Sequence, residues 1–386
     1  MIKPGSKITI PSPIDVHAHL REPGGEAQET IESGTRAALV GGYQAVFDMP
    51  NNPNGQQTWS AERLEDKIAR AKKTAQTDIG FYAGVDLENP ALEEFPAMAE
   101  KAVGLKLYMG PTTGNAKVHD LDIARPAIDA WIAACRDLEN PRPIMLHVRE
   151  ELGAETVRYI AGQGFPVHWC HISTASEIAM ARQLRAKYGD NFTCGATLHH
   201  LTMTARNADY QQGWNGARMQ PPLGDEKDAA ILLAALNDGT VQMLETDHAP
   251  HTLANKLKAE TENPRGLLDA DQTTCYGVGG LEFVLPVMTA LVQRDLISLE
   301  RLVDALYDQP IKLLRLDRSK LTGETVLEFR PYVIGRDDLF SKSSNVPYIG
   351  WTAGARVISV KRGGKEFDPR SATEETTDLP TIQIFP

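Results

Sequence analysis

The feature that most constrains this chain is a regular alternation of short apolar segments with longer amphipathic ones. Eight apolar segments of strand length follow one another: "IDVHAHL", "YQAVFDMPNN", "DIGFYAGVD", "VGLKLYM", "PIMLHV", "PVHWCHI", "FTCGATLHHL" and "TVQMLETDHAPH". Segments such as "SAERLEDKIARAKKTA" lie between them and have helical spacing, here with Ser60 as the N-cap. Continuous apolar strands separated by helices indicate a parallel sheet covered on both faces. The roughly 240 residues that they span match a (β/α)8 TIM barrel of the α/β class.

An open doubly wound sheet is the alternative arrangement of such strands and helices. That class commonly carries a Gly-rich GxGxxG turn after its first strand, and no such turn follows "IDVHAHL". We therefore predict a barrel over residues 12–325, with the terminal segments 1–11 and 326–386 packed on it.

Composition restricts the class of partner. The net charge of −11 argues against nucleic acid or an anionic membrane. No apolar run is long enough to span a bilayer, and the N-terminus "MIKPGSKITIPSP" does not resemble a signal peptide. The cysteines form no CxxC pair and are expected to be reduced. We expect a cytoplasmic protein that acts on a small molecule, and we expect it to be a homodimer.

Polar side chains recur where the predicted strands end. The active sites of barrels lie at these carboxyl ends. His17 and His19 end the first strand, and because residues i and i+2 face the same side, both can reach one ion. The other strand-end candidates are Asn51, Lys106, His147, His171, Asp247, His248 and His251. Imidazole and carboxylate without thiolate favour zinc, or less specifically manganese or iron.

Lys106 is the anomalous member of this group. An ammonium that points at two metal dications would be strongly repelled. A carbamate formed on its nitrogen with CO2 would instead supply two oxygens and a negative charge, and could bridge two metals. The alternative is a barrel lysine paired with a carboxylate.

These residues, taken in order, resemble the amidohydrolase superfamily and within it the dihydroorotases. "DVHAHLREPG" resembles the first dihydroorotase signature, and "ETDHAPHTLANK" resembles the second, including the later Lys256. The segments "MPNN", "GLKLYM", "MLHVRE", "WCHIST" and "MQPPL" resemble further landmarks of that family.

The resemblance implies a role for each candidate. His17 and His19 would bind one zinc with Asp247, His147 and His171 would bind the second, and carboxylated Lys106 and a hydroxide would bridge them. Arg21, Asn51 and His251 would hold the substrate carboxylate, and Gln220 would contact the ring through its backbone. Asp247 would be the general base and acid. The implied reaction is the reversible cyclisation of N-carbamoyl-L-aspartate to L-dihydroorotate in pyrimidine synthesis, with the zinc-activated hydroxide as nucleophile in hydrolysis.

The sequence departs from the family pattern in three places. Glu245 stands where a small residue usually precedes Thr-Asp, and Gln220 stands where many relatives have Asn. Longer relatives carry a β-sandwich built from both termini, so a small β remnant is expected here. Another cyclic amidohydrolase, such as a hydantoinase or allantoinase, and a non-catalytic scaffold are the alternatives. Arg21 argues against the former because hydantoins carry no carboxylate, and the presence of all six ligand residues argues against the latter.

A loop and a histidine pair complete the candidates. Gly110, Pro111 and Gly114 disfavour regular structure after Lys106. We predict that residues 109–118 form a lid whose Thr112 and Thr113 hydroxyls bind the substrate carboxylate, as in some dihydroorotases; the alternative is an ordinary connection. His199 and His200 end the seventh predicted strand and are either structural or part of the pocket.

Overall fold

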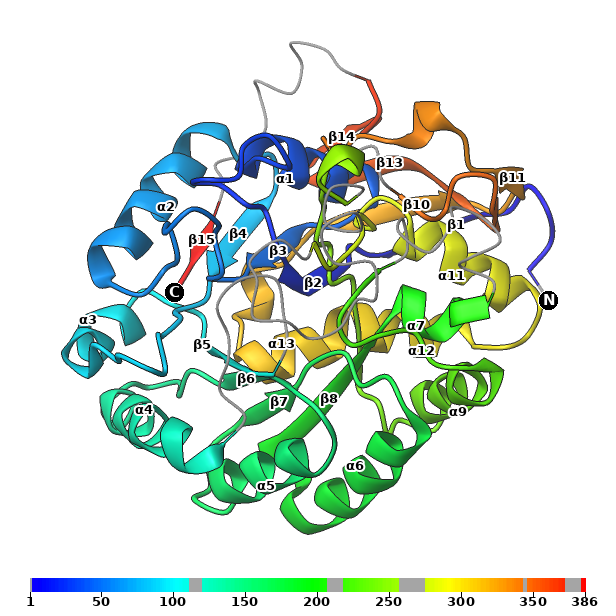
Figure 1. The fold of residues 1–386 in the computed structure, drawn as a ribbon. Coiled ribbons are helices and arrows are strands. Elements are labelled where there is room, and N and C mark those ends of the chain that lie inside the picture. The colour runs from blue at the N-terminus through cyan, green and yellow to red at the C-terminus, as the bar shows by residue number, and fades with distance from the viewer. Residues whose placement is uncertain (1, 111–119, 207–217, 257–274, 343–345, 372–382) are drawn as a thin grey trace.

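The structure is a computed structural model that describes residues 2–110, 120–206, 218–256, 275–342, 346–371 and 383–386. Its centre is a ring of eight parallel strands with helices around the outside (Figure 1). The strands are β2 (Ile14–Ala18), β3 (Ala45–Asp48), β4 (Asp78–Phe81), β5 (Leu105–Met109), β6 (Ile144–Val148), β7 (Val167–Trp169), β8 (Phe192–Thr197) and β9 (Met243–Glu245). Each of the eight apolar segments therefore supplies one strand.

The ring closes at two points by single parallel bridges. Ala83, just after β4, pairs with Leu105 of β5 between the third and fourth strands of the ring, and Ala18 pairs with His248 where the last strand meets the first. Continuous ladders join β2 to β4 and β5 to β9. The (β/α)8 barrel is thereby confirmed, and the open sheet is excluded.

The helices follow the strands as the sequence predicts. They are α1 (Ile31–Val40), α2 (Ala61–Thr74), α3 (Phe95–Ala99), α4 (Leu121–Ala134), α5 (Glu150–Ala161), α6 (Ala175–Tyr188), α7 (Leu198–Thr202), α9 (Glu226–Asn237), α11 (Val284–Gln293), α12 (Leu299–Val303) and α13 (Gln309–Leu314). Ser60 caps α2 by accepting a hydrogen bond from the Arg63 amide. Short turns of 3-10 helix lie at Leu92–Glu94, Gly189–Asn191, Arg318–Lys320 and Arg336–Asp338, and a π turn lies at Asp304–Asp308. No helix in the described ranges is long and apolar enough to cross a membrane.

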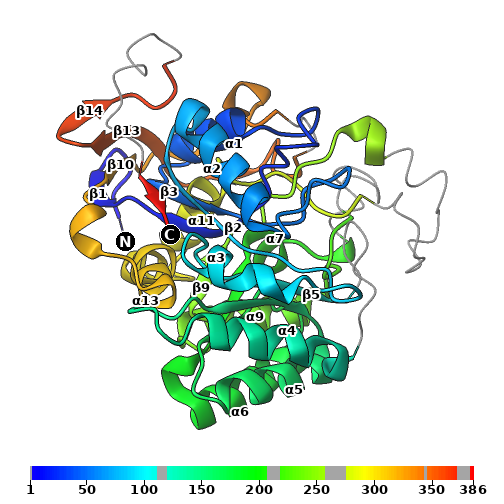
Figure 2. The same ribbon diagram turned by 90° about the vertical axis from the view of Figure 1, so that its left-hand side faces the viewer.

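The terminal segments form extra β-structure beside the barrel. An antiparallel sheet joins β1 (Lys7–Pro11), β10 (Glu324–Glu328), β13 (Arg356–Arg362) and β14 (Lys365–Phe367), and Figure 2 shows it to one side of the barrel. β11 (Tyr332–Val333) pairs with β12 (Thr352–Ala353). The expected β remnant is therefore present, while the predicted domain boundaries stay predictions.

The last strand reaches the barrel itself. β15 (Ile384–Phe385) adds to β4 as a parallel neighbour. The Phe385 ring lies 5.6 Å from the Phe47 ring, within an apolar cluster of barrel residues. The packed apolar cluster and the polar strand ends described next therefore occupy different parts of the same barrel.

Candidate metal centre

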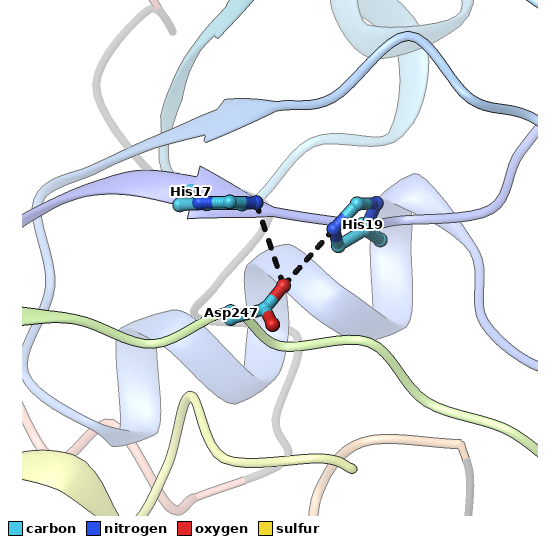
Figure 3. A group of neighbouring side chains, drawn as sticks. All are labelled: His17, His19 and Asp247. Carbon is cyan, nitrogen blue, oxygen red and sulfur yellow. Dashed lines mark hydrogen bonds and ion pairs between the residues drawn. The ribbon is translucent and has the colours of Figure 1, made fainter. Parts of the chain in front are cut away.

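Two histidines and an aspartate converge from the two strands that close the ring. His17 is part of β2, His19 follows it, and Asp247 follows β9. The Asp247 Oδ1 lies 3.1 Å from His19 Nε2 and 3.4 Å from His17 Nε2 (Figure 3). One ligand atom from each of the three lies within 4.8 Å of the others, and all three side chains are buried. The i and i+2 spacing on β2 thus brings both imidazoles to one point, as the sequence predicts.

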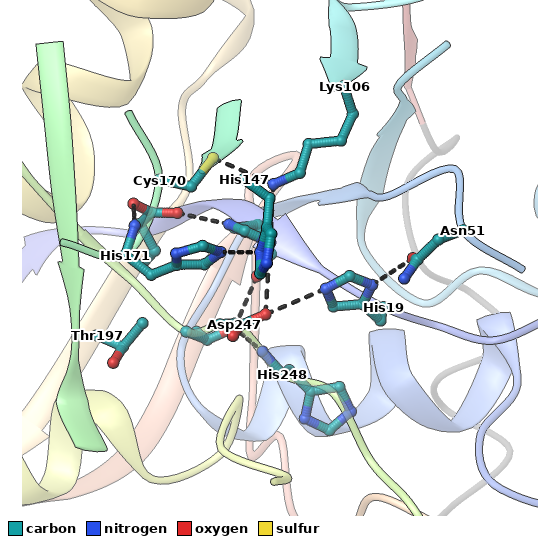
Figure 4. Close-up of polar contacts among 12 residues, drawn as sticks. His19, Asn51, Lys106, His147, Cys170, His171, Thr197, Asp247 and His248 are labelled. Atoms are coloured by element: carbon teal, nitrogen blue, oxygen red, sulfur yellow. Dashed lines mark hydrogen bonds and ion pairs between the residues drawn. The ribbon is translucent and has the colours of Figure 1, made fainter. Parts of the chain in front are cut away.

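A second pair of histidines lies beside this group. His147 is the penultimate residue of β6 and His171 follows β7, and His147 Nδ1 lies 3.0 Å from His171 Nε2. The rings of His17 and His171 are 5.1 Å apart, so the two groups are neighbours. Figure 4 shows His147 and His171 beside His19 and Asp247. His171 Nδ1 has no hydrogen-bond partner among the described residues. Imidazole nitrogens that face one another in a buried site are the donor set that a transition-metal dication prefers.

Lys106 enters the same space from β5. Its side chain is fully buried, and its Nζ lies 3.4 Å from His17 Nε2 and 3.2 Å from Cys170 Sγ (Figure 4). Within the described part of the chain, no carboxylate oxygen lies within ion-pair distance of this Nζ. The alternative of a lysine paired with a carboxylate is therefore not what the described residues show.

Burial sets the protonation of the ligand candidates. Desolvation lowers the pKa of His17, His19 and His171 well below the usual range, with repulsion from neighbouring cationic groups adding to it. Neutral imidazole is the form that binds metal. Desolvation raises the pKa of Asp247 to about 6, although Lys106 opposes the shift.

The side chains predicted to hold substrate surround one pocket. Its empty space is about 340 Å³, and its lining includes His17, His19, Arg21, Asn51, Tyr108, His147, His171, Gln220 and Asp247. Arg21 is buried, donating from Nε to the Pro250 carbonyl at 3.3 Å, and its Nη2 lies 3.2 Å from His251 Nε2. Asn51 Oδ1 lies 2.7 Å from His19 Nδ1. Arg21, Asn51 and Gln220 thus reach the pocket directly, and His251 contacts Arg21.

Backbone strain concentrates at this site. Arg21, His171 and Asp247 have φ values of 61°, 39° and 42°, in the left-handed region that non-glycine residues seldom adopt. Strained residues of this kind persist only where the surroundings hold them, and they cluster at functional sites.

Three of the sequence candidates stand apart from the pocket. His248 Nε2 contacts Glu29 at 3.2 Å, and its Nδ1 accepts a hydrogen bond from the Gly280 amide, so its ring is held by the surrounding protein. His199 and His200 lie in α7 and not at the end of a strand, because Thr197 caps a short helix there. His200 bonds to Thr197 and to the Pro221 carbonyl, which is the structural alternative. Both nitrogens of His199 lack a hydrogen-bond partner among the described residues.

Thr112 and Thr113, with the proposed lid, lie outside the described residues.

Sequence reasoning missed Tyr108, Ala249, Tyr276 and Gly277 of the pocket lining. Tyr108 lines the pocket, and its buried hydroxyl has no hydrogen-bond partner in the described ranges. It lies two residues after Lys106 on the same strand, so the strand period could have revealed it. Glu245, which departs from the family pattern, does not line the pocket; its oxygens bond to His17, His168 and the His171 amide.

Comparisons with known proteins identify the family. A family model described as "Dihydro-orotase-like" matches residues 6–108. A dihydroorotase of Staphylococcus epidermidis is 31% identical, over 89% of this chain and 83% of that protein. A dihydroorotase of Geobacillus thermodenitrificans is also 31% identical, over 91% of this chain and 85% of that protein.

Solved structures support the fold. An L-hydantoinase from Arthrobacter aurescens superposes with a TM-score of 0.79 at 19% identity, covering 96% of this chain and 87% of that one. An inactive dihydroorotase-like domain of a Chaetomium thermophilum CAD-like protein gives 0.75 at 16% identity, covering 98% and 99%. From the sequence relatives, together with the converging strand ends, the chain belongs to the dihydroorotase-like family of amidohydrolases.

Proposed function

We propose that this protein is a dihydroorotase that interconverts N-carbamoyl-L-aspartate and L-dihydroorotate. The observation that carries the proposal is the shared pocket: its lining includes Arg21, Asp247 and four histidines, and Lys106 lies directly behind it, with its Nζ 3.4 Å from His17 Nε2. Such a pocket combines metal ligands with a cation that suits an anionic substrate.

The residues fit a pair of metal ions. His17, His19 and Asp247 would hold one, His147 and His171 would hold the other, and Lys106 as its carbamate would lie between them. Unpaired His171 Nδ1 and the uncompensated Lys106 Nζ support this assignment, because both are costly in a buried site that holds nothing. Two zinc ions, which we propose as the native pair, would polarise the substrate carbonyl and acidify water at neutral pH.

The protein's own groups would bind the substrate and move its protons. The Arg21 guanidinium would pair with the carboxylate of dihydroorotate, since a planar fork matches a carboxylate. Asn51 would add a hydrogen bond, and its Oδ1 meanwhile fixes the His19 ring so that Nε2 faces Asp247. In hydrolysis, the Asp247 carboxylate would accept a proton from the attacking water and deliver it to the ring nitrogen as the C–N bond breaks.

Two other functions remain as outcomes of a test. Hydantoinases share the fold, but the buried Arg21 forms no ion pair with a carboxylate among the described residues, which would be an unrewarded cost for a substrate without an acid group. A non-catalytic scaffold would not need the ligand residues, and the structure brings the histidines, Asp247 and Lys106 together.

The deciding experiment combines a metal count with an assay. Purified protein is analysed for transition metals, and hydrolysis of dihydroorotate, hydantoin and allantoin is measured on the same preparation. We expect about two metals per chain, as in two-metal sites, and activity on dihydroorotate alone. Faster hydrolysis of hydantoin or allantoin would assign a different cyclic amidohydrolase, and loss of all three activities with metal bound would favour the scaffold.

Sedimentation would test the homodimer, and a cytoplasmic location stays a prediction.

A further inference from the structure

We propose that Glu245 is a positioning residue that holds one histidine from each half of the metal centre. The inference rests on the proposed metal centre and deepens it. Glu245 ends β9, is fully buried and lies outside the pocket lining. It therefore acts on the chemistry only through the residues that it touches.

One oxygen of Glu245 fixes the ring of His17. The Oε2 atom lies 2.6 Å from His17 Nδ1, which is a short charge-assisted hydrogen bond. A carboxylate can only accept, so the proton of this neutral imidazole sits on Nδ1. His17 Nε2 then carries the lone pair, and it is this nitrogen that faces Asp247 and Lys106. Carboxylate–histidine pairs of this kind orient metal ligands and raise their basicity.

The other oxygen fixes the second half of the centre. The Oε1 atom accepts a hydrogen bond of 2.9 Å from the backbone amide of His171. His171 has a φ of 39°, a strained conformation that needs support from its surroundings. This bond holds the backbone turn that directs the His171 ring toward His147. A single carboxylate thus ties His17 and His171 to one another.

A further pair of residues holds the carboxylate itself. His168, which is fully buried on β7, contacts Glu245 Oε1 through Nε2 at 3.1 Å, and its Nδ1 lies 2.8 Å from the Thr193 hydroxyl. The Thr193 hydroxyl can donate to His168 Nδ1 while His168 Nε2 donates to the carboxylate, so both ring nitrogens of His168 have a hydrogen-bond partner.

The neighbouring strand leaves room for this carboxylate. Gly195 lies on β8, and a Cβ built on it would come 1.8 Å from Glu245 Oε1. A methyl group at position 195 is enough to cause this clash, because the Gly195 backbone lies directly against the Glu245 carboxylate. Gly195 therefore gives a second way to displace Glu245 without changing its chemistry.

A metal-ligand role for Glu245 is the competing explanation. His17, Cys170 and Glu245 also offer ligand atoms within 4.8 Å of one another. However, both carboxylate oxygens of Glu245 already accept hydrogen bonds, one from His17 and the other from His168 and the His171 amide, and the Cys170 sulfur is the partner of Lys106 Nζ. The contacts favour orientation of ligands over coordination by Glu245.

The test compares Glu245→Gln, Gly195→Ala and Glu282→Gln with the wild-type protein, each loaded with Co²⁺. Gln at position 245 preserves the side-chain volume, but its amide has one accepting oxygen and cannot accept from all three partners. If the amide nitrogen faces His17, it donates to Nδ1 and the imidazole proton moves to Nε2. If the amide nitrogen faces His171, it meets the His171 backbone N–H, and both groups are donors. Glu282 is the matched control, because it is buried and accepts two backbone amides, from Phe340 and Ser341, without touching a ligand candidate. Circular dichroism establishes that each variant is folded.

The readouts are metal release to a chelator and the visible absorption of bound Co²⁺. We expect Glu245→Gln and Gly195→Ala to weaken metal retention by about 10- to 100-fold, the usual effect of losing an outer partner of a ligand, and to change the Co²⁺ spectrum. Glu282→Gln should keep the wild-type spectrum and release rate. In a Glu245→Ala background, Gly195→Ala should have little further effect, because the clash is gone.

Two results would overturn the proposal. One is a folded Glu245→Gln protein with wild-type metal release and spectrum. The other is a third bound metal that Glu245→Gln loses while the other two stay, which would make Glu245 a ligand. Dihydroorotate turnover does not enter the test, so Glu245-dependent metal binding in an inactive protein would overturn only the proposed reaction.

Discussion

Two fully buried lysines in neighbouring parts of the barrel have opposite surroundings. Lys67 on α2 forms an ion pair of 2.5 Å with Asp48, and it donates to the Asn52 side chain and the Met49 carbonyl. Among the described residues, Lys106 on β5 has His17 and Cys170 as its only polar partners within hydrogen-bond distance. The same charged group is thus neutralised by the protein in one place and left uncompensated in the other.

The difference separates a structural lysine from a chemical one. The Lys67 pair supports the loops of the pocket wall, because Asp48 Oδ1 also accepts a hydrogen bond from the Leu20 amide, next to Arg21. A buried ion pair of this kind holds a conformation even where it adds little net stability. Lys106 has no such anion among the described residues, and the carbamate proposed above would supply a negative charge at this place.

The largest expected effect is on Lys106. We predict that Lys106→Ala loses bound metal and lowers kcat by more than about 100-fold, since even outer partners of metal ligands are worth about 10- to 100-fold. Elemental analysis and a dihydroorotate assay measure both. Short carboxylic acids, which could replace the carbamate oxygens, should restore part of the activity. Full activity and full metal content in Lys106→Ala would show that Lys106 is not a bridge.

Arg21 is a third buried cation, and under the proposed function its negatively charged partner would be the carboxylate of the bound substrate. Its contacts are a carbonyl and an imidazole, and desolvation lowers its pKa. Truncating one partner of a buried charge pair costs about 2–5 kcal/mol, so we predict that Arg21→Met lowers kcat/KM for dihydroorotate accordingly while metal content stays unchanged. Steady-state kinetics and a metal count decide the matter. Unchanged kinetics would mean that the carboxylate is held elsewhere.

Substitution of Lys67 should lower the free energy of unfolding and leave the metal content unchanged. Replacing Lys67 with Met leaves Asp48 buried without its cation, which costs about 3–5 kcal/mol. Denaturant unfolding of the metal-loaded protein measures the loss. Arg70→Met on the same helix is the control, because the Arg70 side chain is 40% exposed and its pairs with Asp66 and Glu22 lie near the surface, where a pair contributes about 0–1 kcal/mol. Equal stability of the two variants would remove the distinction between the buried lysines.

The sequence predicts the strand order and most of the site for a physical reason. Parallel strands of a barrel end on one face, so His17, His147 and His171 had to meet once their segments were recognised as strands. Period two placed His19 beside His17 in the same way. These are consequences of local pattern and of one topological rule.

The sequence does not predict contacts made by residues from distant strands below the pocket. Nothing in "MLETDH" indicates that Glu245 turns toward His17 and His168, since those contacts span 228 and 77 positions. Gly195 looks like an ordinary strand glycine until its neighbour is known. His199 and His200 were assigned to a strand end because apolar period alone cannot detect the Thr197 cap.

The smallest predicted effect concerns Lys256, which is a third buried lysine. Its Nζ donates to the Arg218 carbonyl at 3.0 Å, and burial, together with repulsion from Arg218 and Arg21, lowers its pKa from 10.5 to about 7. Between pH 7 and 10.5 the unfolded chain binds this proton and the folded protein does not. The free energy of unfolding should therefore rise with pH in that window, by about 1.4 kcal/mol per unit from this group, and the contribution should be unfavourable below pH 7.

Lys256→Met should remove the slope, measured as the difference between wild type and variant in urea unfolding at pH 7, 8 and 9. Lys101→Met at the exposed Glu65 pair is the control and should leave the slope unchanged. If the wild-type and Lys256→Met curves ran parallel, Lys256 would be charged in the folded protein and would belong with Lys67.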